Sequence, residues 1–317
     1  MIYGRLYAGM GNQMFQYAFC RYLQEEYGQD ICFDISGGTQ ISEKEQDKTN
    51  KFILDSFYLK KEGVEYCRYQ NEFRSKSGMK MKLAIFLDLF PRGIRKISKS
   101  QKIFHYLENI IQKCVNPLGI YTAFDCFYKP YIGHSRKICV SGMFTCEKYF
   151  NSIKEQLLEE FTPKCGIDEK NQSFLHEILE SNSICVHVRK GNSYVMNESL
   201  NVCTKNYYNK AIKMIESRIK NPVFFIFSND LNWCKDKLEL KDNCVLVDAN
   251  DGAHPVEELR LMMNCKHFIL SNSTMSWWAQ YLCRNDKKIV ISPNVWSKGK
   301  IKQLGDLMDE CWVKIEV

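Results

Sequence analysis

Two basic side chains stand at the end of a predicted strand in the second half of the chain. The strand covers residues 183–188 and runs directly into Arg189. Because successive side chains of a strand point to opposite faces, His187 and Arg189 should point the same way. A guanidinium stays charged at any working pH and can bind a phosphate through two hydrogen bonds. Arg189 is therefore a candidate cation for a departing pyrophosphate. The alternative is a solvated strand-end arginine at 189 and a satisfied core histidine at 187.

A polar loop, Ser271 to Thr274, separates a predicted strand at residues 267–270 from a predicted helix. The start of a helix presents unpaired backbone N–H groups and the positive end of the helix dipole, so it can bind an anion. Asn272, Ser273 and Thr274 are therefore candidate binding residues. Helix capping without a ligand explains the same residues about as well.

A third loop, Ser228-Asn229-Asp230, follows a predicted strand at residues 223–227. A carboxylate at this position could accept hydrogen bonds from the edge of a guanine base. Asp230 is also a residue type that often caps helices, and the sequence does not separate the two roles.

A glycine-rich turn near the N-terminus suggests a different chemistry. Gly9 and Gly11 follow a predicted strand at residues 2–7, and Asp34 ends the next predicted strand, as in dinucleotide-binding units. The third glycine of that fingerprint is replaced by Met14, whose bulk would hinder close packing of the helix. An NAD-dependent oxidoreductase that uses the Gly9–Gly11 loop is the main alternative function, and a non-catalytic protein that binds a sugar or nucleotide is the other.

The elements that position these loops indicate an α/β protein with two domains. The first half begins as a strand–helix–strand unit, and in residues 80–102 we expect two short amphipathic helices separated by Pro91-Arg92-Gly93. In the second half, strands alternate with helices, which predicts a parallel sheet. We expect an N-terminal domain at residues 1–165 and a C-terminal domain at residues 166–317. The five strands expected in the second half are 183–188, 223–227, 244–247, 267–270 and 288–291.

Composition and charge narrow the possible functions. The formal net charge of +7 suits anionic ligands but is too small for a nucleic-acid-binding signature. The fifteen cysteines are scattered and odd in number, which indicates reduced thiols and a cytoplasmic protein. The six histidines are dispersed and no Asp-x-Asp pair occurs, so we expect no metal and no cofactor. The charge of a leaving group would then have to be met by protein cations such as Arg189.

The strongest local charge lies in the first half. From Arg74 to His105 the sequence has nine lysines and arginines and a single acid, Asp88. This excess suggests contact with an anionic membrane, at the inner face, where lipid-linked glycans could be reached. A solvated basic face over a small core is the alternative.

Five segments together resemble the bacterial α-1,2-fucosyltransferases of glycosyltransferase family 11. They occur in the family's order and cover the first 20 residues and most of residues 180–296, whereas residues 40–140 match only loosely. The segments are GMGNQMFQYA (Gly9–Ala18), HVRKGN (His187–Asn192), FSND (Phe227–Asp230), SNSTMSWW (Ser271–Trp278) and ISPNVW (Ile291–Trp296).

The resemblance implies a GT-B-like fold, in which two Rossmann-like domains face a cleft and the C-terminal one binds GDP-β-L-fucose. It also implies transfer of fucose with inversion, without a metal, to the 2-hydroxyl of galactose. We expect the acceptor to be a galactose-terminated oligosaccharide or lipid-linked glycan. The residues that match the donor side are His187, Arg189, Lys190, Gly191, Ser228, Asn229, Asp230, Asn272, Ser273 and Thr274. Those that match the cleft or acceptor side are Gly11, Asn12, Gln13 and Asn192.

One departure from the family concerns proton transfer. The family usually reads His-x-Arg-Arg-Gly-Asp, whereas this chain has Lys190 in place of the second arginine and Asn192 in place of the aspartate. A neutral amide cannot accept a proton from the acceptor hydroxyl. Glu198 is the nearest following carboxylate and the candidate general base, with a solvated loop acid as the alternative.

Overall fold

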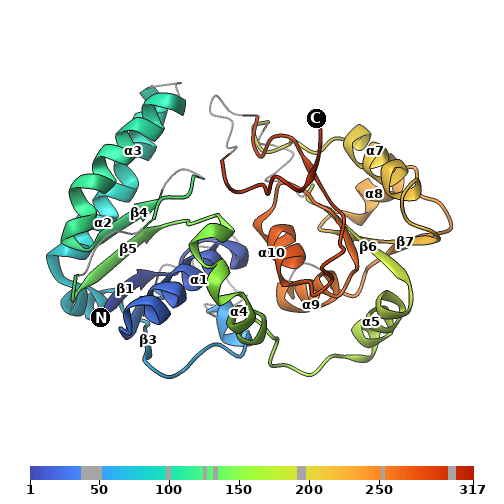
Figure 1. The fold of residues 1–317 in the computed structure, drawn as a ribbon. Helices are drawn as coiled ribbons and strands as arrows, with labels where there is room; N and C mark the ends of the chain where they lie inside the picture. Colours follow the sequence, from blue (N-terminus) through green and yellow to red (C-terminus); the bar gives the residue numbers. More distant parts are fainter. Residues whose placement is uncertain are drawn as a thin grey trace. The chain divides into compact units, whose positions relative to one another are not determined.

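The structure, a computed structural model, divides the chain into two units, each built on its own parallel sheet (Figure 1). Unit 1 comprises Met1–Thr162 with Gly305–Leu307, and unit 2 comprises Pro163–Leu304 with Met308–Val317. The structure describes residues 1–36, 52–97, 101–123, 127–130, 135–190, 198–250, 254–298 and 305–317, without the side chains of 91–97 and 101–105.

Unit 1 contains a five-stranded parallel sheet in the order β3-β2-β1-β5-β4. Its strands are β1 (Ile2–Arg5), β2 (Ile31–Asp34), β3 (Val64–Cys67), β4 (Ile120–Ala123) and β5 (Ile138–Gly142). Its helices are α1 (Met10–Tyr27), α2 (Gln70–Ile97), α3 (Gln101–Val115) and α4 (Lys154–Glu160), with short 3₁₀ turns at Ile53–Ser56, Asn116–Leu118, Glu147–Tyr149 and Asn151–Ile153.

Helices cover both faces of this sheet, with α1 on one side and α2 and α3 on the other (Figure 1). On the α1 side, a Cβ built at Gly4 would lie 2.7 Å from the Cys20 sulfur, so the absence of a side chain lets α1 pack closely. Gly4 of β1 therefore allows the close approach of strand and helix that a third fingerprint glycine would have allowed. The Met14 side chain is buried. On the α2 side, Cys32 and Cys139 pack in the core.

The expected break of the basic segment at Pro91–Gly93 is wrong. Helix α2 continues through these residues to Ile97, because a proline inside a helix removes one backbone hydrogen bond and can bend the helix without ending it. The interruption lies instead at Gly78, with φ 71° and ψ −160°. Only glycine adopts that conformation at little cost, so Gly78 divides α2 into two helical segments.

Unit 2 contains a six-stranded parallel sheet in the order β11-β10-β9-β6-β7-β8. The five predicted strands are present with shifted ends, and the sixth, β11, was not predicted. The strands are β6 (Asn182–Val188), β7 (Pro222–Ser228), β8 (Cys244–Leu246), β9 (His267–Ile269), β10 (Val290–Pro293) and β11 (Val313–Ile315). The helices are α5 (Glu169–Glu180), α7 (Lys205–Glu216), α8 (Leu231–Lys237), α9 (Pro255–Met263) and α10 (Thr274–Leu282).

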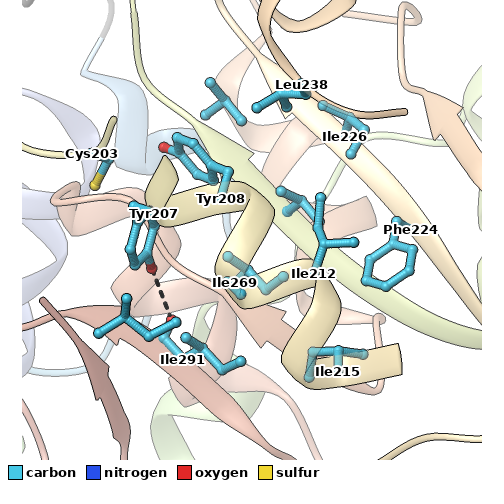
Figure 2. Packing of buried hydrophobic residues seen from close by; sticks show 14 of the residues in the cluster. Cys203, Tyr207, Tyr208, Ile212, Ile215, Phe224, Ile226, Leu238, Ile269 and Ile291 are labelled. Atoms are coloured by element: carbon cyan, nitrogen blue, oxygen red, sulfur yellow. Dashed lines mark hydrogen bonds between the residues drawn. The ribbon is translucent and has the colours of Figure 1, made fainter. Parts of the chain in front are cut away.

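Helix α7 packs its apolar face onto this sheet (Figure 2). Tyr207 and Tyr208 begin that face, and both side chains are buried. The Tyr207 hydroxyl donates to the backbone carbonyls of Leu270 (2.6 Å) and Ile291 (3.3 Å). The Tyr208 hydroxyl donates to the carbonyl of His187 (3.2 Å). The helix therefore ties together the carboxyl ends of β6, β9 and β10, where the predicted site lies.

Candidate functional site

Three of the predicted loops meet at one edge of the unit 2 sheet. Strands β9, β6 and β7 are neighbours and parallel, with Val188 opposite Ser228 and Val186 opposite Ile269. Their carboxyl ends therefore lie side by side, which is where open α/β sheets bind ligands. The loops that begin at Arg189, Asn229 and Leu270 are brought together by this register.

His187 is a buried, neutral residue. Its side chain is 2% exposed, and its Nδ1 lies 2.7 Å from the hydroxyl oxygen of Ser271. Burial, aided by the positive charge of Arg189, lowers the pKa of His187 to about 3. The imidazole therefore carries no charge at neutral pH, and its role in the geometry is to link β6 to the loop after β9.

Lys190 is also buried, and its bonds lie within unit 2. Its backbone N–H donates to Asn229 Oδ1 (2.9 Å), and its ammonium donates to Asn201 Oδ1 (2.7 Å). The ammonium also stands 4.7 Å from the centre of the Trp233 ring. Burial lowers the pKa of Lys190. Lys190 thus joins the loops after β6 and β7.

Arg189 stands between these two buried residues and is itself half-buried. A residue that the sequence did not single out, Glu258 in the first turns of α9, lies within electrostatic reach of its guanidinium. Burial raises the pKa of the Glu258 carboxyl to about 7, and the charge of Arg189 acts in the opposite direction. An acid in the first turn of a helix is a common complement to the helix dipole, so the sequence carried no signal for Glu258.

The residues of the loop after β9 differ in how deeply they are buried. Ser271 and Asn272 are buried, and the Asn272 amide donates to the carbonyls of Leu200 (2.9 Å) and Trp296 (3.0 Å). Ser273 caps α10 by accepting from Met275 N–H (3.3 Å). Ser273 and Thr274 are half-buried at the helix start. The predicted helix start is confirmed, and Asn272 has a clear structural use within it.

The loop after β7 performs the capping that was the alternative to guanine recognition. Asp230 accepts from Trp233 N–H through Oδ1 (2.9 Å), and its own N–H donates to the Ser228 hydroxyl (3.0 Å). Asn229 is exposed beside them. One carboxylate oxygen of Asp230 is therefore used to begin α8.

Glu198 is exposed at the start of a turn. Two contacts hold the residues that follow it: Ser199 accepts from Lys298 N–H (2.8 Å), and Leu200 accepts from Asn272. Gly191 and Asn192 lie outside the described residues. The predicted base is thus attached to a segment that packs on the loop after β9.

The N-terminal residues predicted for the cleft side lie in unit 1, at the start of α1. Gln13 is fully buried and its amide donates to the carbonyl of Ala8 (2.8 Å), which has a positive φ of 66°. Gly11 is buried and Asn12 is half-buried; the Asn12 N–H donates to the carbonyl of Gly9 (3.0 Å). This motif stabilises the strained turn between β1 and α1.

Asp34, the acid on which the dinucleotide interpretation relied, has partners inside unit 1. Its Oδ1 accepts from the backbone N–H (3.0 Å) and hydroxyl (2.5 Å) of Ser36, and its Oδ2 lies 3.6 Å from Arg5 Nε. The carboxylate is 3% exposed. A ribose would have to compete with these bonds.

One group of described residues in unit 1 has a donor set that could hold a metal ion: Cys32, Glu65 and Cys67. The two sulfurs lie 3.4 Å apart, and Glu65 forms an ion pair with Lys76. Burial raises the pKa of both thiols, which opposes the thiolate form that binds metals. Cys32 and Cys67 belong to the core on the α2 side of the sheet, whereas Glu65 is exposed.

The sequence of this chain matches the family model of glycosyl transferase family 11 over residues 1–316. An alpha-1,2-colitosyltransferase of Escherichia coli is 30% identical over 324 residues, which cover 100% of this chain and 99% of that protein. A galactoside alpha-(1,2)-fucosyltransferase 2 of Rattus norvegicus is 29% identical over 148 residues, 44% of this chain and 42% of that protein.

Solved structures share the fold at low sequence identity. The NodZ alpha-1,6-fucosyltransferase soaked with GDP-fucose aligns with a TM-score of 0.50 and 14% identity, over 92% of this chain and 94% of that chain. With the two parallel sheets, this likeness confirms the predicted GT-B-like class of two Rossmann-like units.

Proposed function

The chain belongs to glycosyl transferase family 11, and we propose that it transfers L-fucose from GDP-β-L-fucose to the 2-hydroxyl of a galactose-containing glycan. Relatives named alpha-1,2-colitosyltransferase and galactoside alpha-(1,2)-fucosyltransferase support an α-1,2 linkage. The family favours a transferase over the NAD-dependent oxidoreductase and the non-catalytic binding protein.

Three neighbouring basic residues differ in charge and in burial, and this difference is the main support for the proposal. His187 is buried and neutral, and Lys190 is buried with its pKa lowered by that burial. Arg189 is the half-buried one, at the carboxyl edge of the sheet. A guanidinium there is suited to the diphosphate of a nucleotide sugar, because it stays charged and can form two parallel hydrogen bonds.

The proposed reaction is an in-line displacement at the anomeric carbon. The galactose 2-oxygen attacks fucose C1 while the bond from C1 to the β-phosphate oxygen breaks, so that GDP departs and the configuration inverts. Arg189 stabilises the negative charge that develops on the diphosphate. The proton of the attacking hydroxyl passes to a carboxylate, for which Glu198 is our candidate because Asn192 cannot accept it.

Glu258 is proposed as a positioning residue for Arg189. A carboxyl whose pKa lies near 7 changes its charge in the working pH range of an enzyme, and it does so within reach of the guanidinium. Glu258→Gln should therefore change the pH dependence of kcat near neutral pH. A profile identical in shape to that of the wild type would exclude this role.

Replacement of Arg189 tests the central assignment. Arg189→Ala should keep the fold and lower kcat/KM by about 100-fold to 1,000-fold, the usual effect of removing one charge stabiliser. Arg189→Lys should recover part of the activity, and Arg284→Ala, an exposed arginine of the same unit, is the matched control. Near-wild-type transfer by Arg189→Ala would refute the role.

A substrate screen tests the reaction itself. Purified protein is offered GDP-fucose and other GDP-sugars, including GDP-colitose, with galactosyl oligosaccharides, in the presence and absence of EDTA. We expect fucosyl transfer that is unchanged by EDTA. Thermal stabilisation by NAD and not by GDP, without transfer, would instead favour the oxidoreductase.

The acceptor and location follow from the same proposal. We propose a galactose-terminated oligosaccharide or lipid-linked glycan as acceptor, and a cytoplasmic enzyme that works at the inner face of the membrane. Within the described residues, no helix combines the length and apolar character needed to cross a bilayer.

A further inference from the structure

Helix α2 has a buried inner face that fixes its orientation on the unit 1 sheet. Met81 and Ala84 lie in the core, 1% and 0% exposed. One turn further, Asp88 is also buried, and its Oδ2 accepts from the hydroxyls of Tyr7 (3.2 Å) and Ser141 (3.3 Å). A helix anchored in this way should present polar residues on its opposite face.

The opposite face is apolar instead. Met79, Leu83, Phe86 and Phe90 are spaced by four, three and four residues, which places them on one side of the helix. Their exposed fractions are 76%, 40%, 59% and 48%. The Phe86 and Phe90 rings pack together with centroids 5.9 Å apart. We call these four residues the outer stripe; Leu89, 51% exposed, lies at its edge.

Basic residues flank the outer stripe along the sequence of α2. Lys82 is exposed and precedes Phe86 by one helical turn, and Arg74 is exposed before the Gly78 interruption. The last two turns of α2 also contain Arg92, Arg95 and Lys96 in the sequence. Between Phe73 and Leu107 the single acid is Asp88, which is buried. The other acid of α2, Glu72, is paired with Lys76 at the start of the helix, away from the outer stripe.

The exposed apolar side chains and the basic residues together indicate the chemistry of the partner. Contiguous exposed apolar side chains normally mark a contact surface. A second copy of the chain would bring the same surface against itself in a two-fold dimer, and the lysines and arginines would repel each other. An anionic lipid bilayer supplies both an apolar phase for the aromatic side chains and negative headgroups for the basic ones.

We propose that the outer stripe of α2 docks unit 1 on an anionic membrane surface. The helix lies in the plane of the interface, with Phe86 and Phe90 at the boundary between headgroups and acyl chains and Lys82 among the phosphates. The inference rests on unit 1 alone and does not require the proposed transferase activity. It would place the enzyme where lipid-linked acceptors are found.

Vesicle co-sedimentation of the full chain tests the proposal. Wild-type protein should bind vesicles of phosphatidylcholine with phosphatidylglycerol and bind phosphatidylcholine alone much more weakly. Phe86→Ser with Phe90→Ser should weaken binding by at least about tenfold, since each removes apolar area from the contact. Lys82→Gln should weaken it about fivefold, the effect of one basic residue at an anionic surface.

Two controls keep the outcome interpretable. Leu179→Ser changes an equally exposed leucine on α5 of unit 2 and should leave vesicle binding unchanged. Circular dichroism and transfer to a soluble acceptor should be unchanged in the Phe86/Phe90 variant, so loss of binding is separated from loss of fold or activity. The proposal is overturned if the wild-type protein does not bind anionic vesicles. It is also overturned if the Phe86/Phe90 variant binds them as well as the wild type does. So does a wild-type dimer that the double variant converts to a monomer.

Discussion

His187 and Arg189 are two positions apart at one strand end, yet they have opposite electrostatic characters. Burial makes charging His187 costly, so the imidazole is neutral and hydrogen-bonded to Ser271. Arg189 cannot lose its proton and is half-buried at the same edge. The contact with Ser271 thereby holds the loop after β9 in place without adding a second positive charge beside the proposed diphosphate site.

The buried imidazole predicts acid sensitivity of unit 2. The pKa of His187 is about 3 in the folded chain against 6.5 for an ordinary histidine, so its contribution to stability is present above pH 6.5 and is lost as the pH falls toward 3. Between about pH 7.5 and about pH 5, the wild type should lose about 2 kcal/mol more unfolding free energy than His187→Gln.

Urea unfolding followed by tryptophan fluorescence measures this difference, because all five tryptophans lie after Pro163, in unit 2. The rise in the pKa of Glu258 has the opposite sign, with stability lost as the pH increases toward 7, but it is common to both proteins. Equal losses in the two proteins would show that His187 does not titrate as described.

Among the secondary-structure elements, α1 and α4 of unit 1 are joined by a buried ion pair. The Arg21 guanidinium, 1% exposed, bonds to Glu160 at 2.8 and 3.0 Å, and it also bonds to Gln24. The Tyr17 hydroxyl donates to the other Glu160 oxygen (2.6 Å). Each charge is paired and hydrogen-bonded, which makes its burial tolerable.

Removal of one partner of this pair should destabilise unit 1 strongly. Arg21→Met leaves the Glu160 carboxylate buried without its counter-charge and should cost about 3–5 kcal/mol. Lys60→Met removes a more exposed partner of Glu25 in the same unit and should cost less than about 1 kcal/mol. Guanidinium unfolding followed by circular dichroism compares them, and similar small losses would show that the buried pair contributes little.

For the whole molecule, the two units allow ligand binding to be assigned separately. If unit 2 binds the donor, GDP should slow amide hydrogen exchange in segments around Arg189, Asn229 and Ser273 and leave the Gly9–Gln13 turn of unit 1 unchanged. Hydrogen exchange of the full chain with and without GDP, read by mass spectrometry of its peptides, measures the exchange rates of both regions. Protection confined to Gly9–Gln13 would move the nucleotide to unit 1.

Saturating GDP should also raise the midpoint of the tryptophan-reported thermal transition. At a concentration of about 100 times Kd, binding stabilises the folded form by about 2.7 kcal/mol. Arg189→Ala should lose most of this gain, whereas Arg284→Ala should keep it. An equal gain in both variants would indicate that Arg189 is not part of the nucleotide site.

Several features were predictable because they depend on local pattern. Alternating strands and helices after residue 166 predicted the parallel sheet of unit 2, and the polar residues after its strands predicted which loops would meet. Family membership agreed with the five motifs. These inferences succeed because parallel strands always bring their carboxyl ends to one edge.

Other features were decided by tertiary structure, because they depend on what surrounds a residue. The sequence alone determined that Arg189 follows a strand and that Asn192 replaces an acid. It could not show that His187 is neutral or that Glu258 lies near Arg189, because desolvation and distance arise only on folding. Nor could it show that α2 continues past Pro91, or that its outer stripe stays exposed, because only packing on the sheet decides which of two apolar faces is buried.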